Sequence, residues 1–271
     1  MINKKIIVCV VMFVLLVSAV FAGGSKEQSQ SVTLNPGKLT VATSPDFAPY
    51  EFYMLENGKP QLAGFDIALA RYIADYMKLE LEIIPMDFDG ILMELQNGGA
   101  DLGISGFSPN PERAEVVDFS QIYYDGKQSF VCLKKDQAKY GTIESINKKD
   151  VTVGAQIGSI QMDLAQKYSP NADLVALTKV TDLVAELVAG KIDGAYLEKP
   201  VAESYLKNYP QLCYAFDVPY DSEGNVVLVK KGNSALLEQV KAAIDSALKD
   251  GSMSAFVEKA MTDALNEYLP N

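Results

Sequence analysis

Short apolar segments alternate with longer amphipathic segments along most of this chain. The pattern predicts strands, because each apolar segment has the length of a buried strand and is bounded by polar or glycine-containing residues. Alternation of strands with helices is typical of α/β layers with largely parallel strands. We expect strands at residues 38–43, 79–85, 102–105, 128–134, 151–155, 174–177, 194–197, 212–216 and 226–230.

The segments between these strands predict helices, the clearest of which covers residues 65–77. There Phe65, Leu69, Tyr72, Ile73 and Tyr76 recur at a spacing of three or four residues and define one apolar face. We expect that whole face to be buried. Two further helices are expected at residues 234–249 and 252–265.

One segment of the chain returns at an offset of 92 residues. Residues 94–101 read Glu-Leu-Gln-Asn-Gly-Gly-Ala-Asp, and residues 186–193 read Glu-Leu-Val-Ala-Gly-Lys-Ile-Asp. Each copy predicts a helix that ends at a glycine, then a turn with an aspartate and a short strand. Either the similarity is chance, since this succession is common, or the chain has two similar lobes. Ligands of open α/β sheets bind beyond the carboxyl ends of strands, which directs attention to the residues after each aspartate.

The first residues predict a signal peptide over residues 1–22, followed by a polar segment over residues 23–36. Two lysines precede an unbroken apolar run from Ile6 to Val17, and Val-Phe-Ala at residues 20–22 is a suitable cleavage site. The alternative is an uncleaved membrane anchor, for which the run is short. No cysteine directly follows the predicted cleavage site, so lipid attachment at that site is not expected.

Charge and residue usage exclude several classes of function. The chain has 24 basic and 35 acidic residues, a net charge of −11, and loss of the leader with its two lysines makes it −13. Such a surface disfavours a nucleic-acid partner. The absence of histidine removes Ser-His-Asp and Cys-His catalysis and the commonest metal ligand, so we expect no metal and no cofactor. Cys132 and Cys213 lie in apolar stretches and are expected to be buried thiols, although an exported protein permits a disulfide.

A glycine, a hydroxyl and a guanidinium follow one another in residues 105–113, Ser-Gly-Phe-Ser-Pro-Asn-Pro-Glu-Arg. Such a loop can hold a carboxylate, because Arg113 offers a planar fork and the following helix offers backbone N–H groups. The alternative places Arg113 on a helix face, paired with Glu112 or Asp118. Spacing alone does not separate the two interpretations.

The same segment and its continuation, Ala-Glu-Val-Val-Asp-Phe-Ser, resemble the signature of polar amino-acid-binding proteins of ABC importers, the bacterial extracellular solute-binding proteins of family 3. Other family phrases follow in order from residue 38 to about residue 251. They lie at residues 42–52, 64–67, 85–88, 153–159 and 191–200.

The resemblance implies an α/β fold of periplasmic-binding-protein type II, with two lobes that are joined by a two-stranded hinge and close on a ligand. Residues 37–125 and 221–271 are expected to form lobe 1, and residues 126–220 are expected to form lobe 2. The crossings between the lobes are expected near residues 124–128 and 219–225.

For the ligand's charged groups, the resemblance implies a carboxylate site and an ammonium site on opposite walls. Arg113 is expected to grip the carboxylate with help from Ser108 and Ser159. Gly106, Ser108 and Glu198 are expected to receive the ammonium. The alternative for Glu198 is a solvated face.

For the ligand's side chain, the resemblance implies an aromatic sandwich between Phe47 and Phe88, unless these rings belong to the core. Ser44, Gln156 and Ile160 complete the expected ligand-binding set.

Two positions depart from the family pattern. Glu198 stands where an aspartate is usual, so its longer side chain has to set the ligand back or bend. Ser44 stands where relatives that bind basic side chains often carry an acid, which favours a neutral ligand, although Asp46 is close in sequence.

The function expected from the resemblance is capture of a free amino acid in the periplasm by a monomer and delivery to an ABC permease in the inner membrane. We expect no enzymatic activity. One alternative is an enzyme of the same fold, such as a cyclohexadienyl or arogenate dehydratase with Glu198 as general acid. Another is a ligand sensor that docks to a membrane receptor.

Overall fold

The computed structural model describes residues 32–221 and 224–267. The predicted signal peptide and residues 23–31 of the polar segment lie outside this part of the chain. No helix in the described residues is long and apolar enough to cross a membrane.

The first of two five-stranded sheets has the order β5-β1-β6-β13-β7. β1 is parallel to β5 and β6, and β13 is antiparallel to β6 and β7, so one strand of the five is reversed. The strands are β1 (Lys38–Thr43), β5 (Glu80–Pro85), β6 (Leu102–Gly103), β7 (Val117–Phe119) and β13 (Leu228–Lys230).

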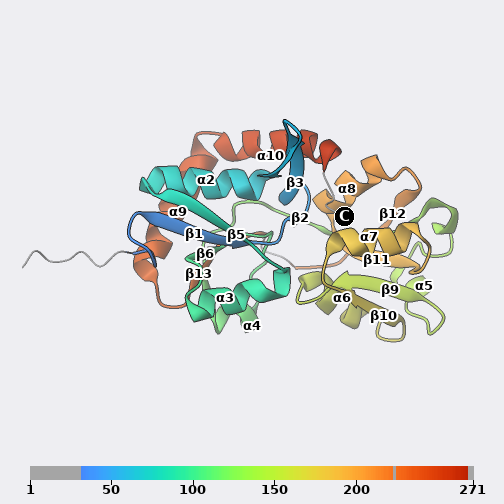
Figure 1. The fold of residues 1–271 in the computed structure, drawn as a ribbon. Helices are drawn as coiled ribbons and strands as arrows, with labels where there is room; N and C mark the ends of the chain where they lie inside the picture. The colour runs from blue at the N-terminus through green and yellow to red at the C-terminus, as the bar shows by residue number, and fades with distance from the viewer. Residues whose placement is uncertain (1–31, 222–223, 268–271) are drawn as a thin grey trace, which may run out of the picture. The chain divides into compact units, whose positions relative to one another are not determined.

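Helices cover both faces of this first sheet because its strands alternate apolar residues between the two sides. Leu39 and Val41 of β1 pack in one cluster with α2 (Phe65–Met77) and α9 (Ser234–Lys249), and Ala42 packs with α3 (Ile91–Asn97) in another. Figure 1 shows these helices around β1, with α10 (Ser252–Asp263) beside α2. The expectation that the whole apolar face of the helix at 65–77 is buried was wrong at Tyr76, which is 49% exposed near the helix end.

The second sheet has the order β10-β9-β11-β8-β12 and repeats this plan. β9, β10 and β11 are parallel, and β8 is antiparallel to both β11 and β12. The strands are β8 (Gln128–Leu133), β9 (Thr152–Gln156), β10 (Asp173–Leu177), β11 (Gly194–Glu198) and β12 (Leu212–Val218).

Helices also cover both faces of the second sheet (Figure 1). α7 (Val180–Val188) and α8 (Lys199–Asn208) share a core with Val131 and Leu133 of β8, whereas α6 (Ile160–Tyr168) packs with Phe130 and Cys132 on the opposite side. Cys132 and Cys213 are buried free thiols that face each other across β8 and β12, with their sulfur atoms 3.8 Å apart.

The chain passes between the two sheets twice, once after β7 and once before β13. These passages lie antiparallel to each other, joined by a bridge between Tyr124 and Asn225. The reversed strands β8 and β13 are the ones that follow the two passages. The remaining helices are short: α4 (Pro111–Ala114), α5 (Ile143–Ile146), η1 (Phe88–Gly90), η2 (Lys134–Asp136) and η3 (Ala264–Asn266).

A small sheet that was not predicted follows β1. It contains β2 (Asp46–Phe47), β3 (Glu51–Glu56) and β4 (Lys59–Ala63) in antiparallel order. The hairpin turn between β3 and β4 is Asn57-Gly58, and both residues have positive φ, 53° and 75°. Asn-Gly is the pair preferred in two-residue hairpin turns of this kind, so the sequence contained this signal.

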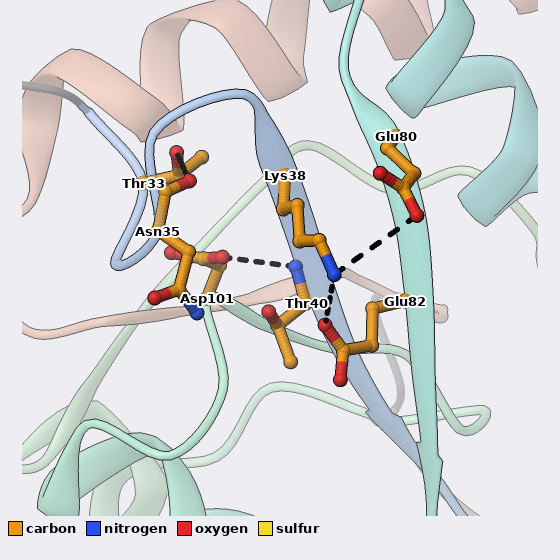
Figure 2. Close-up of polar contacts among 7 residues, drawn as sticks. All are labelled: Thr33, Asn35, Lys38, Thr40, Glu80, Glu82 and Asp101. Atoms are coloured by element: carbon orange, nitrogen blue, oxygen red, sulfur yellow. Dashed lines mark hydrogen bonds and ion pairs between the residues drawn. The ribbon is translucent and has the colours of Figure 1, made fainter.

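The two copies of the repeated segment occupy equivalent positions, one in each sheet. The backbone N–H and one carboxylate oxygen of Asp101 bind the backbone of Thr40 in β1, with the Thr40 N–H donating at 2.9 Å. Asp193 makes the same pair of contacts with Thr152 in β9, at 2.8 Å. Figure 2 shows the first copy beside Lys38, which also pairs with Glu82. The repeat therefore marks two similar lobes, each built on one sheet.

Candidate functional site

All ten predicted site residues line one cavity between the two sheets. Four of them follow the carboxyl ends of strands in the parallel parts of the sheets, where ligands of such sheets bind. The cavity contains about 340 Å³ of space free of protein atoms, including its opening. Its lining consists of Ser44, Asp46, Phe47, Phe88, Ser105, Gly106, Ser108, Arg113, Gln156, Ser159, Ile160, Gln161 and Glu198.

The guanidinium of Arg113 is positioned by contacts from both lobes. α4 begins after Asn110, whose side chain accepts the Arg113 backbone N–H at 2.7 Å. The Nη1 atom of Arg113 donates to the carbonyl of Ser108 at 2.7 Å, and Nη2 donates to the carbonyl of Gly158 at 3.0 Å. The rings of Phe88 and Phe107 lie 5.7 and 5.1 Å from the guanidinium carbon, a cation–π arrangement.

This buried cation has no acidic partner within 4.0 Å among the described residues. Asp118, one of the two acids considered as its partner, pairs instead with Lys231 at 2.9 Å. Burial lowers the pKa of Arg113 to about 10, so the group stays charged at neutral pH. Two of its five N–H groups bind carbonyls, and the other three remain for an anion in the cavity.

The amino end of α6 lies beside Arg113 and adds backbone donors to this wall. Ser159 caps the helix: its Oγ accepts the Met162 N–H at 3.2 Å and donates to the carbonyl of Gln156 at 2.7 Å. A helix start and an arginine together make a favourable site for a carboxylate.

Glu198 lies at the end of β11 and is almost fully buried, at 2% exposure. Its Oε1 accepts hydrogen bonds from the Tyr50 hydroxyl at 2.9 Å and from the Asn225 amide at 3.3 Å. Burial raises the pKa of Glu198 to about 8, although these two hydrogen bonds oppose the shift. Below that pH the carboxyl is mostly protonated.

The extra methylene of Glu198 is accommodated by bending toward the first passage between the lobes. A Cβ atom at Gly126 would lie only 1.7 Å from Glu198 Oε1 and 3.0 Å from the Tyr50 hydroxyl. The absence of a side chain at Gly126 therefore makes room for the carboxyl.

Gly106 needs to be glycine for two reasons. Its φ is +56°, and an added Cβ would lie 2.9 Å from the ring of Phe47. Its N–H donates to Asp66 at 2.8 Å, and its carbonyl accepts from Asn225 at 2.8 Å. The backbone here is thus fixed at the cavity wall.

The two predicted aromatic residues lie in the wall and are also packed from behind. Phe47 contacts Tyr50 with ring centroids 5.1 Å apart, and Phe88 stacks on Phe107 at 4.5 Å. Both Phe47 and Phe88 keep 8% exposure. The structure therefore combines the two interpretations, core packing on one face of each ring and the cavity on the other.

Asp46 belongs to the cavity wall, although the predicted set did not include it. Its carboxylate accepts the Ser44 hydroxyl at 2.7 Å, and from the other lobe the Val180 N–H at 2.6 Å and the Gln156 amide at 3.4 Å. Burial raises its pKa to about 6 against these hydrogen bonds, so it is mostly ionised at neutral pH. Ser44 and Asp46 also line an adjoining groove with Asp87, Asp182 and Lys179.

Other residues around the cavity differ in whether the sequence signalled them. Asp46 and Ser105 stand inside the family phrases, and Gln161 directly follows two predicted residues. Asn225 is different: it comes from the second passage between the lobes, and no local pattern marks it. No group of three acidic or sulfur-containing side chains suitable for a metal occurs in the described residues.

The sequence of the whole cavity-forming region matches a known family. The family model for bacterial extracellular solute-binding proteins, family 3, matches residues 39–263. The chain belongs to this family.

Individual relatives of this family 3 protein agree in fold and length. ArtP, the arginine-binding extracellular protein of Bacillus subtilis, is 32% identical over 246 residues, covering 89% of this chain and 91% of ArtP. The solved structure of AbpA, an amino-acid ABC transporter substrate-binding protein from Streptococcus pneumoniae bound to L-arginine, is 38% identical with a TM-score of 0.82. It covers 85% of this chain and 97% of its own.

A more distant relative of the family 3 protein is an enzyme. Cyclohexadienyl dehydratase of Pseudomonas aeruginosa is 24% identical over 238 residues, covering 88% of this chain and 86% of the enzyme. The predicted family and fold class are confirmed by these comparisons.

Proposed function

We propose that this protein is the substrate-binding component of an ABC importer and encloses a free amino acid between its two lobes. One observation carries the proposal: the guanidinium of Arg113, at 4% exposure and without an acidic partner among the described residues, lines the same cavity as buried Glu198. An uncompensated buried charge is costly. A zwitterion removes that cost, because it brings a carboxylate for one wall and an ammonium for the other.

The ligand's carboxylate would bind at Arg113, with Ser108, Ser159 and the start of α6 as further donors. Its ammonium would bind Glu198, together with the carbonyl of Gly106 and the hydroxyl of Ser108. Contact with the ammonium favours the charged form of Glu198. Binding at neutral pH would therefore release a proton from this carboxyl.

For the ligand's side chain we propose a positive charge, as in arginine, held between Phe47 and Phe88. Asp46 supplies a mostly ionised carboxylate in the wall beside Ser44, ArtP is named an arginine-binding protein, and the AbpA structure has L-arginine bound. This differs from the neutral side chain expected from the sequence, which gave more weight to Ser44 than to Asp46. Gln156 and Ile160 would complete the contacts from the other lobe.

A thermal-shift screen against the twenty amino acids tests this function. A ligand that binds only the folded state raises stability in proportion to RT ln(1 + [L]/Kd), so a submicromolar ligand at millimolar concentration gives a shift of several degrees. L-arginine and L-lysine should give the largest shifts, and D-arginine serves as the matched control. If none of the twenty shifts the transition, the proposal fails.

The transport setting is proposed from the family. The protein would act as a periplasmic monomer that delivers its ligand to a permease in the inner membrane. We also propose that lobe 1 comprises residues 37–125 and 221–271 and lobe 2 comprises residues 126–220. The bridge between Tyr124 and Asn225 supports passages at these places.

A second function is favoured by one specific observation. Glu198 has a pKa of about 8, so its carboxyl holds a proton at neutral pH, as a general acid must. Together with the dehydratase relative, this makes turnover of prephenate or arogenate the assay to perform. We favour binding without catalysis, because the cavity has contacts for both charged ends of a zwitterion. Release of product by wild-type protein and not by Glu198→Gln would establish the enzyme instead.

A further inference from the structure

Two buried acids hold the cavity-lining turn Ser105-Gly106 from behind. Glu51 at the start of β3 is 0% exposed and Asp66 in α2 is 1% exposed. Glu51 Oε1 accepts the Ser105 hydroxyl, and Asp66 Oδ2 accepts the Gly106 N–H at 2.8 Å and the Tyr123 hydroxyl at 2.9 Å. Consecutive residues of the turn are thus anchored to different acids.

The second oxygen of each acid, Glu51 Oε2 and Asp66 Oδ1, lacks a donor among the described residues. No lysine or arginine forms an ion pair with either acid in this part of the chain. Two ionised carboxylates buried together without a cation would be strongly destabilising. A single proton between them removes one charge and satisfies both oxygens.

The electrostatics of the pair indicate which acid carries the proton. Burial first, and then the negative charge of Asp66, raise the pKa of Glu51 well above its ordinary value. A hydrogen bond between the two carboxyls raises the pKa of Glu51 and lowers that of Asp66, whose pKa burial brings to about 6. The other acid that acts on Glu51 is Asp46, which also disfavours its ionisation.

We propose that Glu51 and Asp66 share one proton, donated from Glu51 Oε2 to Asp66 Oδ1, and that the pair positions the Ser105-Gly106 turn for ligand binding. The ligand part of this inference rests on the proposed function, and the shared proton does not. Neither acid lines the cavity, so both act through the turn and not by contact with the ligand.

Amide substitutions test the shared proton because they fix where the donor lies. Glu51→Gln keeps an acceptor for Ser105 and presents an NH₂ group to Asp66. Asp66→Asn keeps an acceptor for Gly106 and presents an NH₂ group to Glu51, which then ionises. The double variant turns two NH₂ groups toward each other, so no hydrogen bond forms between residues 51 and 66. Glu56→Gln, an exposed position of the same strand, is the matched control.

The experiment combines thermal unfolding of the ligand-free protein with calorimetric titration of L-arginine. Each single variant should fold and bind within about threefold of the wild type, and the double variant should bind at least about tenfold more weakly, since it loses one buried hydrogen bond. Loss of folding only in the double variant supports the shared proton equally. The shared proton would be overturned if the effects of the two single substitutions on Kd and on unfolding temperature simply add in the double variant, or if Glu51→Gln does not fold.

Two further readouts separate the parts of the inference. Folded wild type keeps a proton on Glu51 that the unfolded chain releases above pH 5, so its unfolding temperature should fall more steeply from pH 6 to 9 than that of Glu51→Gln. Equal slopes would overturn the shared proton. A double variant that is destabilised but binds arginine normally would overturn the positioning role. If the wild type binds no amino acid, the proposed function fails. Thermal unfolding of the wild type, the two single variants and the double variant still tests whether Glu51 and Asp66 share a proton.

Discussion

Replacing Arg113 by alanine is the sharpest test of the carboxylate site. The substitution removes the guanidinium, which in the wild type donates to the carbonyls of Ser108 and Gly158 and has three further N–H groups without an acceptor among the described residues. Because burial already disfavours this charge and lowers its pKa to about 10, its removal should cost the ligand-free protein little stability. The expected defect is in ligand binding and not in folding.

The size of the Arg113→Ala effect follows from two charge-assisted hydrogen bonds to the ligand's carboxylate. At about 1.5–3 kcal/mol each, their loss costs about 3–6 kcal/mol, or roughly 100- to 10,000-fold in Kd. Arg113→Lys retains the charge but not the planar fork, so it cannot make two parallel hydrogen bonds to the ligand's carboxylate. We therefore expect it to recover only a small part of the loss.

Calorimetric titration with L-arginine, alongside thermal unfolding without ligand, measures both effects. Arg71→Ala is the matched control, because Arg71 is exposed and, within residues 32–221 and 224–267, its guanidinium donates one hydrogen bond, to the carbonyl of Leu62 at 3.4 Å. It should bind as the wild type does. If Arg113→Ala binds L-arginine within about threefold of the wild type, Arg113 does not hold the carboxylate and the reasoning from its unpaired charge is wrong.

Three further predictions concern the other wall and the side-chain end. Glu198, with a pKa of about 8, should release a proton when the ligand's ammonium binds, so the Kd for L-arginine should fall as pH rises from 6 to 8. Glu198→Gln should remove this pH dependence. If the variant keeps the wild-type pH profile, Glu198 does not bind the ammonium. Asp46→Asn should weaken binding of L-arginine by about tenfold or more and leave binding of L-glutamine nearly unchanged in the same titration, since only a cationic side chain needs the carboxylate's negative charge. Equal losses for the two ligands would point to a structural effect of the substitution. Gly126→Ala should displace the Glu198 carboxyl, whose Oε1 would lie 1.7 Å from the added Cβ, and weaken binding by at least about tenfold in that assay. Gly190→Ala strains a left-handed residue (φ +71°) that has open space at its Cβ and lies outside the cavity lining, so it is the control for a loss of stability alone.

Local pattern was sufficient for the main elements of the fold. The predicted strand at residues 38–43 and the helices at 65–77 and 234–249 match β1, α2 and α9 at both ends, because each has a complete apolar face and a defined terminus. β6 is shorter than predicted, since the chain turns into the cavity at Ile104 and Ser105 to form the ligand wall. The hairpin of β3 and β4 was missed because its strands are half exposed and lack a continuous apolar run.

The candidate site was predictable where one passage of chain carries several of its groups. Ser108 and Arg113 come from a single loop and short helix, and the family phrases located the residues of the second lobe. Contacts across long sequence separations were not predictable. Tyr50, Gly126 and Asn225 meet Glu198 from three different segments, and no local pattern marks these contacts.

The contacts of Arg113 and Glu198 bear on how the ligand-free protein can be stable and, under the proposed function, still select a zwitterion. Among the described residues, Arg113 donates hydrogen bonds to two carbonyls and keeps its charge without an acidic partner, whereas Glu198 accepts from a hydroxyl and an amide and, with a pKa of about 8, is mostly protonated at neutral pH. Neutral hydrogen bonds limit the cost of burial without competing for the counter-ion. Since Arg113 also reaches Gly158 in the other lobe, a ligand that draws the guanidinium to its carboxylate acts on a contact that joins the lobes. Under the proposed function, ligand binding and lobe closure would be coupled through this side chain, because the ligand's carboxylate and the Gly158 carbonyl would both use donors of the same rigid fork.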